Sequence, residues 1–132
     1  MEITIISDGG SRGNPGPSAV GIVLKDSEGN ILESLHKSIG FATNNEAEYE
    51  ALIFGLETVK KYSPDSIICV SDSQLVIRHL SGEYQVTATS MIPLYKRAKL
   101  LLDDFSDYKL VWLSRKHMNE ADKLVNRSLD GG

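Results

Sequence analysis

Four acidic residues stand at positions from which a sheet and its helices could bring them together. Asp8 ends an alternating, β-branched stretch and Asp72 ends an almost continuously apolar one, and parallel neighbouring strands would place both carboxylates at one edge of a sheet. Glu48 and Asp122 fall near the starts of two expected helices. Four carboxylates in one small space need counter-ions, and hard oxygen ligands favour Mg²⁺ or Mn²⁺ over zinc. The pattern therefore predicts a divalent-metal site.

Such a site has a defined chemistry. Two divalent ions about 3.5 to 4 Å apart, bridged by a carboxylate, activate a water and stabilise the leaving oxygen in a phosphoryl displacement, so the four acids indicate nuclease chemistry. Any one acid alone is more often a helix cap or a solvated surface charge. Glu48 argues against that alternative because it lies on the same helical face as Leu52 and Leu56, where a carboxylate is costly unless a cation or hydrogen bonds meet it.

The elements that must hold these acids follow from hydropathy periodicity and from turn residues. Strands are expected over residues 2–8, 19–25, 31–37, 66–71 and 109–113, and helices over residues 43–61, 73–80, 92–105 and 119–129. Residues 8–17 are so rich in glycine and proline that a loop is expected there. Thr43 and Glu46 have the spacing of a capping box at the start of the first helix. The order βββαβααβα predicts an α/β fold, with a five-stranded mixed sheet flanked by helices.

Length and composition limit the class of protein. The 132 residues suit a single domain, residues 1–132, and the 41% hydrophobic and 24% charged residues exclude a disordered or disulfide-built chain. The net charge of -4 leaves no bulk positive field, so any binding of a polyanion must be local. Cys69, the single cysteine, lies in an apolar run and is expected to pack in the core. Without a signal sequence or an apolar stretch of membrane-spanning length, the cytoplasm is the expected compartment.

Four motifs of the sequence, in their order and spacing, resemble those of the type 1 ribonuclease H family. They are DGGSxGNPG from Asp8, TNNxxE from Thr43, SDSQLV from Ser71 and ADxL from Ala121, and the resemblance covers about residues 2–128. It is greatest with the compact archaeal and bacterial members, and it implies the ribonuclease H-like fold.

The resemblance also implies an activity, which is endonucleolytic hydrolysis of the RNA strand of an RNA/DNA hybrid, leaving 5′-phosphate and 3′-hydroxyl ends. By resemblance, Asp8, Glu48, Asp72 and Asp122 correspond to the catalytic metal-binding acids. They would hold two Mg²⁺ ions when substrate is bound, with Asp8 bridging the ions and with Mn²⁺ as a possible substitute.

The resemblance further implies a substrate surface. Four amide side chains would line the minor groove of the hybrid and meet 2′-hydroxyls and base edges; they are Asn14, Asn44, Asn45 and Gln74. Glu48 would also sense a 2′-hydroxyl beside the scissile phosphate. Thr43 and Asn14 would hold a phosphate of the DNA strand, and the backbone amides of Gly10 and Ser11 would approach the RNA closely. Outside the family context, Asn14 is equally a turn residue and Thr43 equally a helix cap.

One departure from the family concerns positive charge. Many members carry a Lys- and Trp-rich protrusion that grips the DNA strand, and residues 82–91 leave no room for it. Affinity for the hybrid is then expected to rest on the expected helix 92–105, through Lys96, Arg97 and Lys99, and on scattered bases such as Arg12, Lys37 and Arg115. A merely solvated helix face is the alternative for this cluster.

A second departure lies in the segment before Asp122. Relatives commonly have asparagine four residues before the last aspartate, whereas Met118 occupies that place here and Asn119 comes one residue later. His117 is the candidate for the loop histidine that assists water activation or product release in some members, although its spacing is shorter than in those members. Arg115 is a candidate either for a phosphate contact or for a salt bridge to the acids.

Two other classes of function compete with the nuclease. A hybrid-binding module that does not cut would keep the fold, although the presence of all four acids argues against it. A phosphate-binding ATPase of actin-like architecture is suggested by the strand that ends in Asp8, Gly9 and Gly10, but that architecture needs two such domains to clamp a nucleotide. The expected partner is therefore an RNA/DNA hybrid duplex and not a membrane, and the expected state is a monomer.

Overall fold

The structure is a computed structural model that describes residues 1–115 and 119–130, except for the side chains of residues 119, 120, 122, 124 and 128. Five strands form one sheet in the order β3-β2-β1-β4-β5. They are β1 (Glu2–Ser11), β2 (Gly16–Lys25), β3 (Ile31–Ala42), β4 (Ser66–Ser71) and β5 (Asp107–Trp112). The helices are α1 (Asn44–Val59), with a 3-10 turn η1 (Lys60–Tyr62), α2 (Gln74–Leu80), α3 (Ile92–Asp103) and α4 (Asn119–Leu129).

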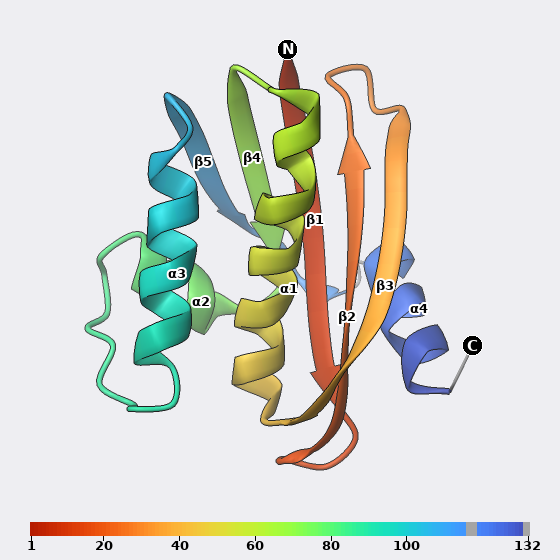
Figure 1. Ribbon diagram of the computed structural model, residues 1–132, viewed down its shortest axis with the longest axis vertical. Helices are drawn as coiled ribbons and strands as arrows, with labels where there is room; N and C mark the ends of the chain where they lie inside the picture. The colour runs from red at the N-terminus through yellow and green to blue at the C-terminus, as the bar shows by residue number, and fades with distance from the viewer. Residues whose placement is uncertain (116–118, 131–132) are drawn as a thin grey trace.

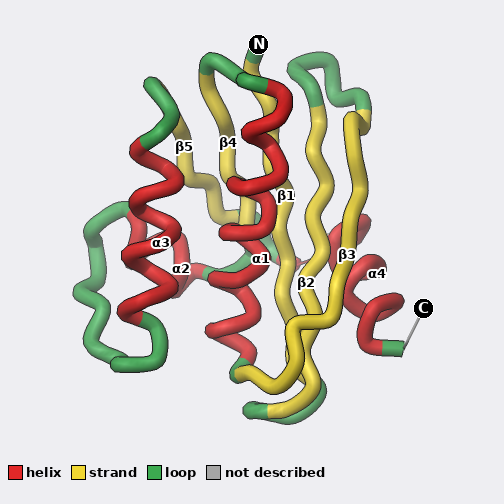
Figure 2. The backbone as a smooth tube through the Cα atoms, viewed as in Figure 1, coloured by secondary structure: helices red, strands yellow, loops and turns green. Residues whose placement is uncertain are grey.

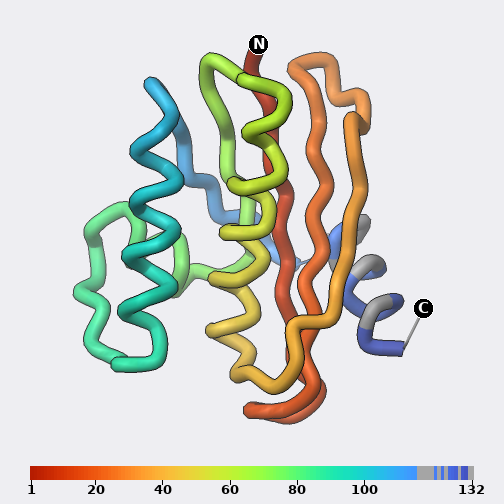
Figure 3. Tube along the Cα trace, viewed as in Figure 1, coloured from red at the N-terminus to blue at the C-terminus, as the bar shows by residue number. Residues whose placement is uncertain are grey.

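The sheet separates two layers of helices. Figure 1 shows α1 and α3 in front of the sheet and α4 behind it, and Figure 2 shows the same layers coloured by secondary structure. The chain runs through β1, β2 and β3 before it crosses into α1, as the red-to-yellow path in Figure 3 shows. The expected five-stranded mixed sheet with flanking helices is therefore confirmed.

Strand β1 lies at the centre of this arrangement and joins its two halves. It pairs antiparallel with β2 and parallel with β4, and β4 pairs parallel with β5. Ser7 of β1 is the register partner of Ser71 of β4, so the residues that follow them, Asp8 and Asp72, emerge side by side at the same edge. The parallel pairing of the first and fourth strands, on which the predicted site depends, is therefore confirmed.

The glycine-rich segment after Asp8 is largely strand, and the expectation of a loop over residues 8–17 is wrong for much of its length. Strand β1 continues to Ser11 and β2 already begins at Gly16. A methyl group on Gly9 would overlap the carbonyl of Ala47 in α1, and one on Gly10 would lie 3.2 Å from Val125 of α4. These glycines therefore allow β1 to pack closely against α1 on one face and α4 on the other. Local turn propensity does not reveal this packing role.

Helix α1 begins as expected from its capping box. The Thr43 hydroxyl accepts a hydrogen bond from the Glu46 backbone N–H at 3.2 Å, and the Glu46 carboxylate accepts one from the Thr43 N–H at 2.7 Å. Leu52, Leu56 and Val59 are each at most 1% exposed and pack on the sheet. Because burial of such side chains is the main stabilising term in folding, this stripe fixes the helix against β1 and β2.

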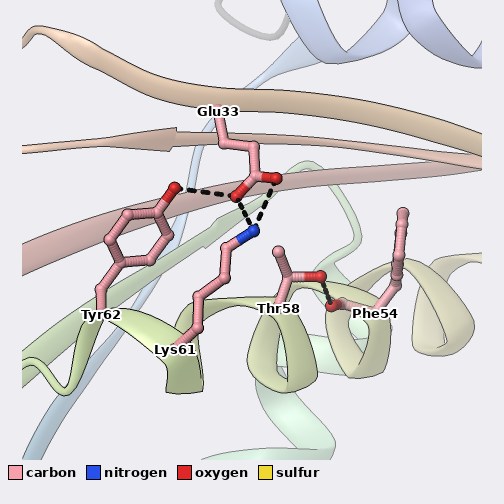
Figure 4. A network of polar contacts seen from close by, with 5 residues as sticks. All are labelled: Glu33, Phe54, Thr58, Lys61 and Tyr62. Carbon is pink, nitrogen blue, oxygen red and sulfur yellow. Dashed lines mark hydrogen bonds and ion pairs between the residues drawn. The ribbon is translucent and has the colours of Figure 1, made fainter.

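The far end of α1 is tied to β3 by a polar network (Figure 4). Glu33 accepts hydrogen bonds from Lys61 and from the Tyr62 hydroxyl, both at 2.8 Å. The Lys61 ammonium holds the pKa of the Glu33 carboxyl below its usual value. On α1 itself, the Thr58 hydroxyl donates to the Phe54 carbonyl at 2.8 Å. The network lies at the end of the helix opposite Glu48 and so anchors α1 without contributing to the acidic cluster.

Two further expectations concern Cys69 and membranes. Cys69 is 1% exposed in β4, and burial raises the pKa of its thiol to about 12, so the thiol packs in the core as expected. None of the helices that the structure describes is long and apolar enough to cross a membrane.

Candidate metal centre and active site

Three carboxylates converge at the edge where β1 and β4 end. Asp8 comes from β1, Glu48 from the first turns of α1, and Asp72 from the junction between β4 and α2. One oxygen from each carboxylate lies within 4.8 Å of the other two. Asp8 is 2% exposed and Glu48 is 5% exposed, so the cluster is screened very little by water. The structure thus brings together three of the four acids that the sequence singled out.

Glu48 is held in the cluster by a backbone contact with β1. Its Oε1 accepts a hydrogen bond from the Gly9 N–H at 2.6 Å. Burial, a hydrogen bond with Asp72, and the charges of Asp72 and Asp8 together raise the pKa of Glu48 well above its ordinary value of 4.5. Without a cation, the cluster therefore favours a proton on Glu48. A divalent cation would supply the positive charge that this proton supplies otherwise.

The donor set suits a hard divalent ion. The Oδ1 atom of Asp72 is buried and has no hydrogen-bond partner among the described residues. A buried carboxylate oxygen without a donor is costly, and a cation between the carboxylates would satisfy it. Among the residues that the structure describes, the set consists of three carboxylates without sulfur or imidazole, which matches Mg²⁺ or Mn²⁺ better than zinc. The residues present therefore fit the ion that the sequence predicted.

Two residues from the end of β5 and the segment after it contact Asp72. The Arg115 Nε atom lies 3.3 Å from Asp72 Oδ2, so the salt-bridge alternative for Arg115 is the one that the structure shows. Trp112 donates from its indole N–H to the Asp72 backbone carbonyl at 3.0 Å. Sequence reasoning missed Trp112, because only the pairing of β4 with β5, in which Ser71 faces Trp112, shows that it reaches the acidic cluster.

The fourth acid lies on α4. This helix packs on β1, β2 and β3, and Val125 of α4 meets Gly10 next to Asp8. The side chain of Asp122 lies outside what the structure describes, as do residues 116–118, which include His117 and Met118. Their assignments to the site therefore remain predictions.

A small cavity of about 150 Å³ lies beside the acids. Its lining includes Asp8 and four residues that the sequence assigned to substrate binding, which are Gly10, Ser11, Asn44 and Arg115. The Asn14 side chain accepts a hydrogen bond from the Asn44 N–H at 3.0 Å. That bond joins the hairpin between β1 and β2 to the start of α1, so these candidate substrate residues form one continuous surface next to the metal centre.

The remaining candidate substrate residues lie on helix termini and on α3. Thr43 caps α1, and its expected contact with a phosphate stays a prediction. Asn45 and Gln74 are exposed in the first turns of α1 and α2. On α3, Lys96 is exposed, Arg97 is paired with Glu57 of α1, and Lys99 donates to the Tyr108 hydroxyl at 3.4 Å. Part of this basic cluster is therefore engaged with the protein itself, and its role in hybrid binding remains a prediction.

The close packing of β1 on α1 leads to a prediction for Gly9→Ala. The added methyl group would lie 2.7 Å from the Glu48 backbone nitrogen and would overlap the Ala47 carbonyl. Because backbone atoms cannot move aside as side chains do, we expect the free energy of unfolding to fall by about 1 to 3 kcal/mol. Urea denaturation checks this, with Gly10→Ala as the comparison, because its added methyl group would meet only the Val125 side chain, at 3.2 Å, and no backbone atom. Unchanged stability of Gly9→Ala would contradict the packing.

Comparisons with known proteins show which family this chain resembles in sequence and in fold. Residues 6–128 match the model of the family described as "Reverse transcriptase-like". Ribonuclease HI of Halobacterium salinarum is 42% identical over 123 residues, which are 93% of this chain and 62% of that protein. A bifunctional protein of Mycobacterium tuberculosis is 37% identical over 98% of this chain and 36% of its own length. The chain thus spans about a third to somewhat under two thirds of the length of these relatives.

Solved structures show the same fold over the whole chain. RNase H1 from Halobacterium salinarum superposes with a TM-score of 0.97 at 39% identity and covers 100% of both chains. LC11-RNase H1, solved in complex with an RNA/DNA hybrid, superposes with a TM-score of 0.94 at 34% identity and covers 98% of this chain and 97% of that one. From the matched family model, the relatives and the structural agreement, the chain belongs to the type 1 ribonuclease H family.

Proposed function

We propose that this chain is a metal-dependent endonuclease that hydrolyses the RNA strand of RNA/DNA hybrids, leaving 5′-phosphate and 3′-hydroxyl ends. The convergence of three carboxylates, from β1, α1 and the β4–α2 junction, with those of Asp8 and Glu48 buried, is the observation that carries the proposal. Its relative LC11-RNase H1 was solved with an RNA/DNA hybrid, which supports this class of substrate for the present chain.

In this proposal Asp8, Glu48, Asp72 and Asp122 hold two divalent ions, Mg²⁺ or Mn²⁺. When bound, these ions supply the charge that activates a water and stabilises the leaving oxygen. The protein's own groups keep the acids in place. The Gly9 N–H holds Glu48, and the sheet pairing of Ser7 with Ser71 holds Asp8 beside Asp72.

The surface beside the acids would bind the hybrid. Gly10 and Ser11 lie close to Asp8 and offer backbone where a ribose and phosphate could approach. Asn14, Asn44, Asn45 and Gln74 carry amides that could meet 2′-hydroxyls and base edges in a minor groove, which is how RNA is distinguished from DNA. With a net charge of -4 and no basic protrusion, we expect hybrid affinity to be modest and to fall as salt rises.

A cleavage assay tests the substrate and the metal together. Labelled RNA/DNA hybrid, duplex RNA, duplex DNA and single-stranded RNA are each incubated with Mg²⁺, Mn²⁺ or EDTA. We expect cutting of the RNA strand of the hybrid with either ion and none in EDTA. The 5′ ends created by cleavage should be labelled by polynucleotide kinase and labelled ATP only after treatment with a phosphatase.

Other outcomes would replace the proposal. Cutting of duplex DNA alone would overturn the assignment of the substrate. A hybrid that binds but stays uncut in both Mg²⁺ and Mn²⁺ would favour the binding module that does not cut. Thermal stabilisation by ATP, without cleavage, would favour the nucleotide-binding alternative.

A further inference from the structure

The peptide group that joins Asp72 to Ser73 is hydrogen-bonded at both of its ends. Its carbonyl oxygen, which belongs to Asp72, accepts from the Trp112 indole N–H at 3.0 Å. Its N–H, which belongs to Ser73, donates to the Ser71 hydroxyl at 3.0 Å. A peptide group is planar and rigid, so it cannot rotate without breaking one of these bonds. Together the two bonds fix the backbone dihedral that follows the Asp72 Cα atom.

This support is needed because Asp72 lies between two regular elements. Strand β4 ends at Ser71, whose carbonyl accepts from the Leu113 N–H at 3.1 Å, and α2 begins at Gln74 with Ser73 as its N-cap. The indole of Trp112 therefore contributes a bond to Asp72 at the point where the regular pairing of β4 with β5 stops.

The indole is not there simply to fill the core. Trp112 lies at the end of β5, the edge strand of the sheet (Figure 1), and is 44% exposed. Its polar N–H nevertheless points at the backbone of a residue in the acidic cluster. Three carboxylates within 4.8 Å of one another repel when ionised, and Asp72 is the member outside both strand and helix. A fixed backbone opposes the displacement that this repulsion favours.

We propose that Trp112 is a positioning residue of the metal centre. Its indole N–H holds Asp72 in the arrangement that receives a divalent cation, so that cation binding does not have to order the β4–α2 junction. This inference rests on the proposed function in requiring that the acids bind a cation. Loss of one neutral hydrogen bond changes an equilibrium by roughly fivefold, and we expect the affinity for Mn²⁺ and Mg²⁺ to fall by about that factor.

The test exploits the fact that Trp112 is the only tryptophan of the chain. Expression in a tryptophan-requiring host with β-(3-benzothienyl)alanine replaces the indole N–H by sulfur at this single position and keeps the ring shape. Trp112→Phe is the genetic counterpart. Mn²⁺ binding is measured by calorimetry and by electron paramagnetic resonance, and cleavage of the hybrid is followed as a function of Mg²⁺ concentration.

We expect both altered proteins to bind Mn²⁺ roughly fivefold more weakly and to need correspondingly more Mg²⁺ for half-maximal cleavage. At saturating Mg²⁺ the rate should approach that of the unaltered protein, because a positioning residue takes no part in the chemical step. Tyr108→Phe is the matched control, since it removes a polar group from the same strand, where the Tyr108 hydroxyl contacts Lys99 and not the acids. Its cation affinity should be unchanged.

The outcomes separate this inference from the proposed function. Unaltered Mn²⁺ affinity in the benzothienylalanine protein would overturn the role of Trp112 while leaving the metal centre intact. Absence of Mn²⁺ and Mg²⁺ binding by the unaltered protein would overturn the metal centre itself. If Trp112→Phe does not fold, the benzothienylalanine protein still decides the question, because it retains the bulk of the side chain.

Discussion

Asp72→Asn is expected to abolish cleavage of the hybrid in Mg²⁺ and, in EDTA, to raise the free energy of unfolding. The amide keeps the shape of the side chain but removes a charge that the cation needs. Loss of a group that only orients a metal ligand lowers metal affinity or activity roughly ten- to a hundredfold. Loss of a ligand's own charge should therefore lower the cleavage rate by more than about a hundredfold. Without a cation Glu48 favours its protonated form, so the change mainly relieves the repulsion between Asp72 and Asp8. This relief should outweigh the lost contact with exposed Arg115 by about 1 kcal/mol.

Two measurements check these opposite effects. Cleavage is measured with labelled hybrid in Mg²⁺, and stability by urea denaturation in EDTA. Asp103→Asn, which makes the same change at an exposed site on α3, is the control and should alter neither quantity. Cleavage by Asp72→Asn at the rate of the unaltered protein would show that the acids are not the catalytic site.

The metal-free protein is expected to lose stability as the pH rises above 4.5, the ordinary pKa of a glutamate. Burial and the neighbouring carboxylates raise the pKa of Glu48 in the folded protein, so between 4.5 and that raised value the folded chain binds more protons than the unfolded chain. The free energy of unfolding then decreases with pH across this window and levels off above it. Below pH 4.5 Glu48 is protonated in both the folded and the unfolded chain, so it contributes no pH dependence to the free energy of unfolding.

Glu48→Gln and Mg²⁺ should each remove this dependence, for different reasons. Glutamine has no proton to lose, and its carbonyl oxygen can still accept from the Gly9 N–H. Mg²⁺ stabilises the ionised carboxylates and so adds most stability at high pH. Urea denaturation in EDTA at a series of pH values, repeated with Mg²⁺, measures both effects. An identical slope in the unaltered protein and in Glu48→Gln, without metal, would show that Glu48 does not titrate as described.

Much of the site could be predicted because its acids coincide with local sequence signals. Asp8 and Asp72 follow β-branched or apolar runs, and Glu48 interrupts the apolar stripe of a helix whose capping box is itself visible in the sequence. Each of these signals is local. Bringing Asp8 and Asp72 together requires in addition that the first and fourth strands are parallel neighbours. The structure confirms that pairing.

What could not be predicted depends on contacts between distant segments. The glycines after Asp8 indicate a loop by composition, yet they form strand because α1 and α4 pack on both sides of them. Trp112 and Arg115 both contact Asp72 because of the register in which β5 pairs with β4. The periodicity of a single sequence does not determine that register. Asp122 and His117 stay predictions.

The central position of β1 has a consequence for the order of events in folding. The first three strands form a meander of neighbouring segments, whose contacts are local and can form early. Of the three carboxylates that converge at the site, that meander contains only Asp8. Glu48 and Asp72 join it only when α1 docks and β4 pairs with β1 across a long stretch of chain. Because the cluster is complete only in the assembled sheet, we expect a bound divalent ion to slow unfolding more than it speeds folding.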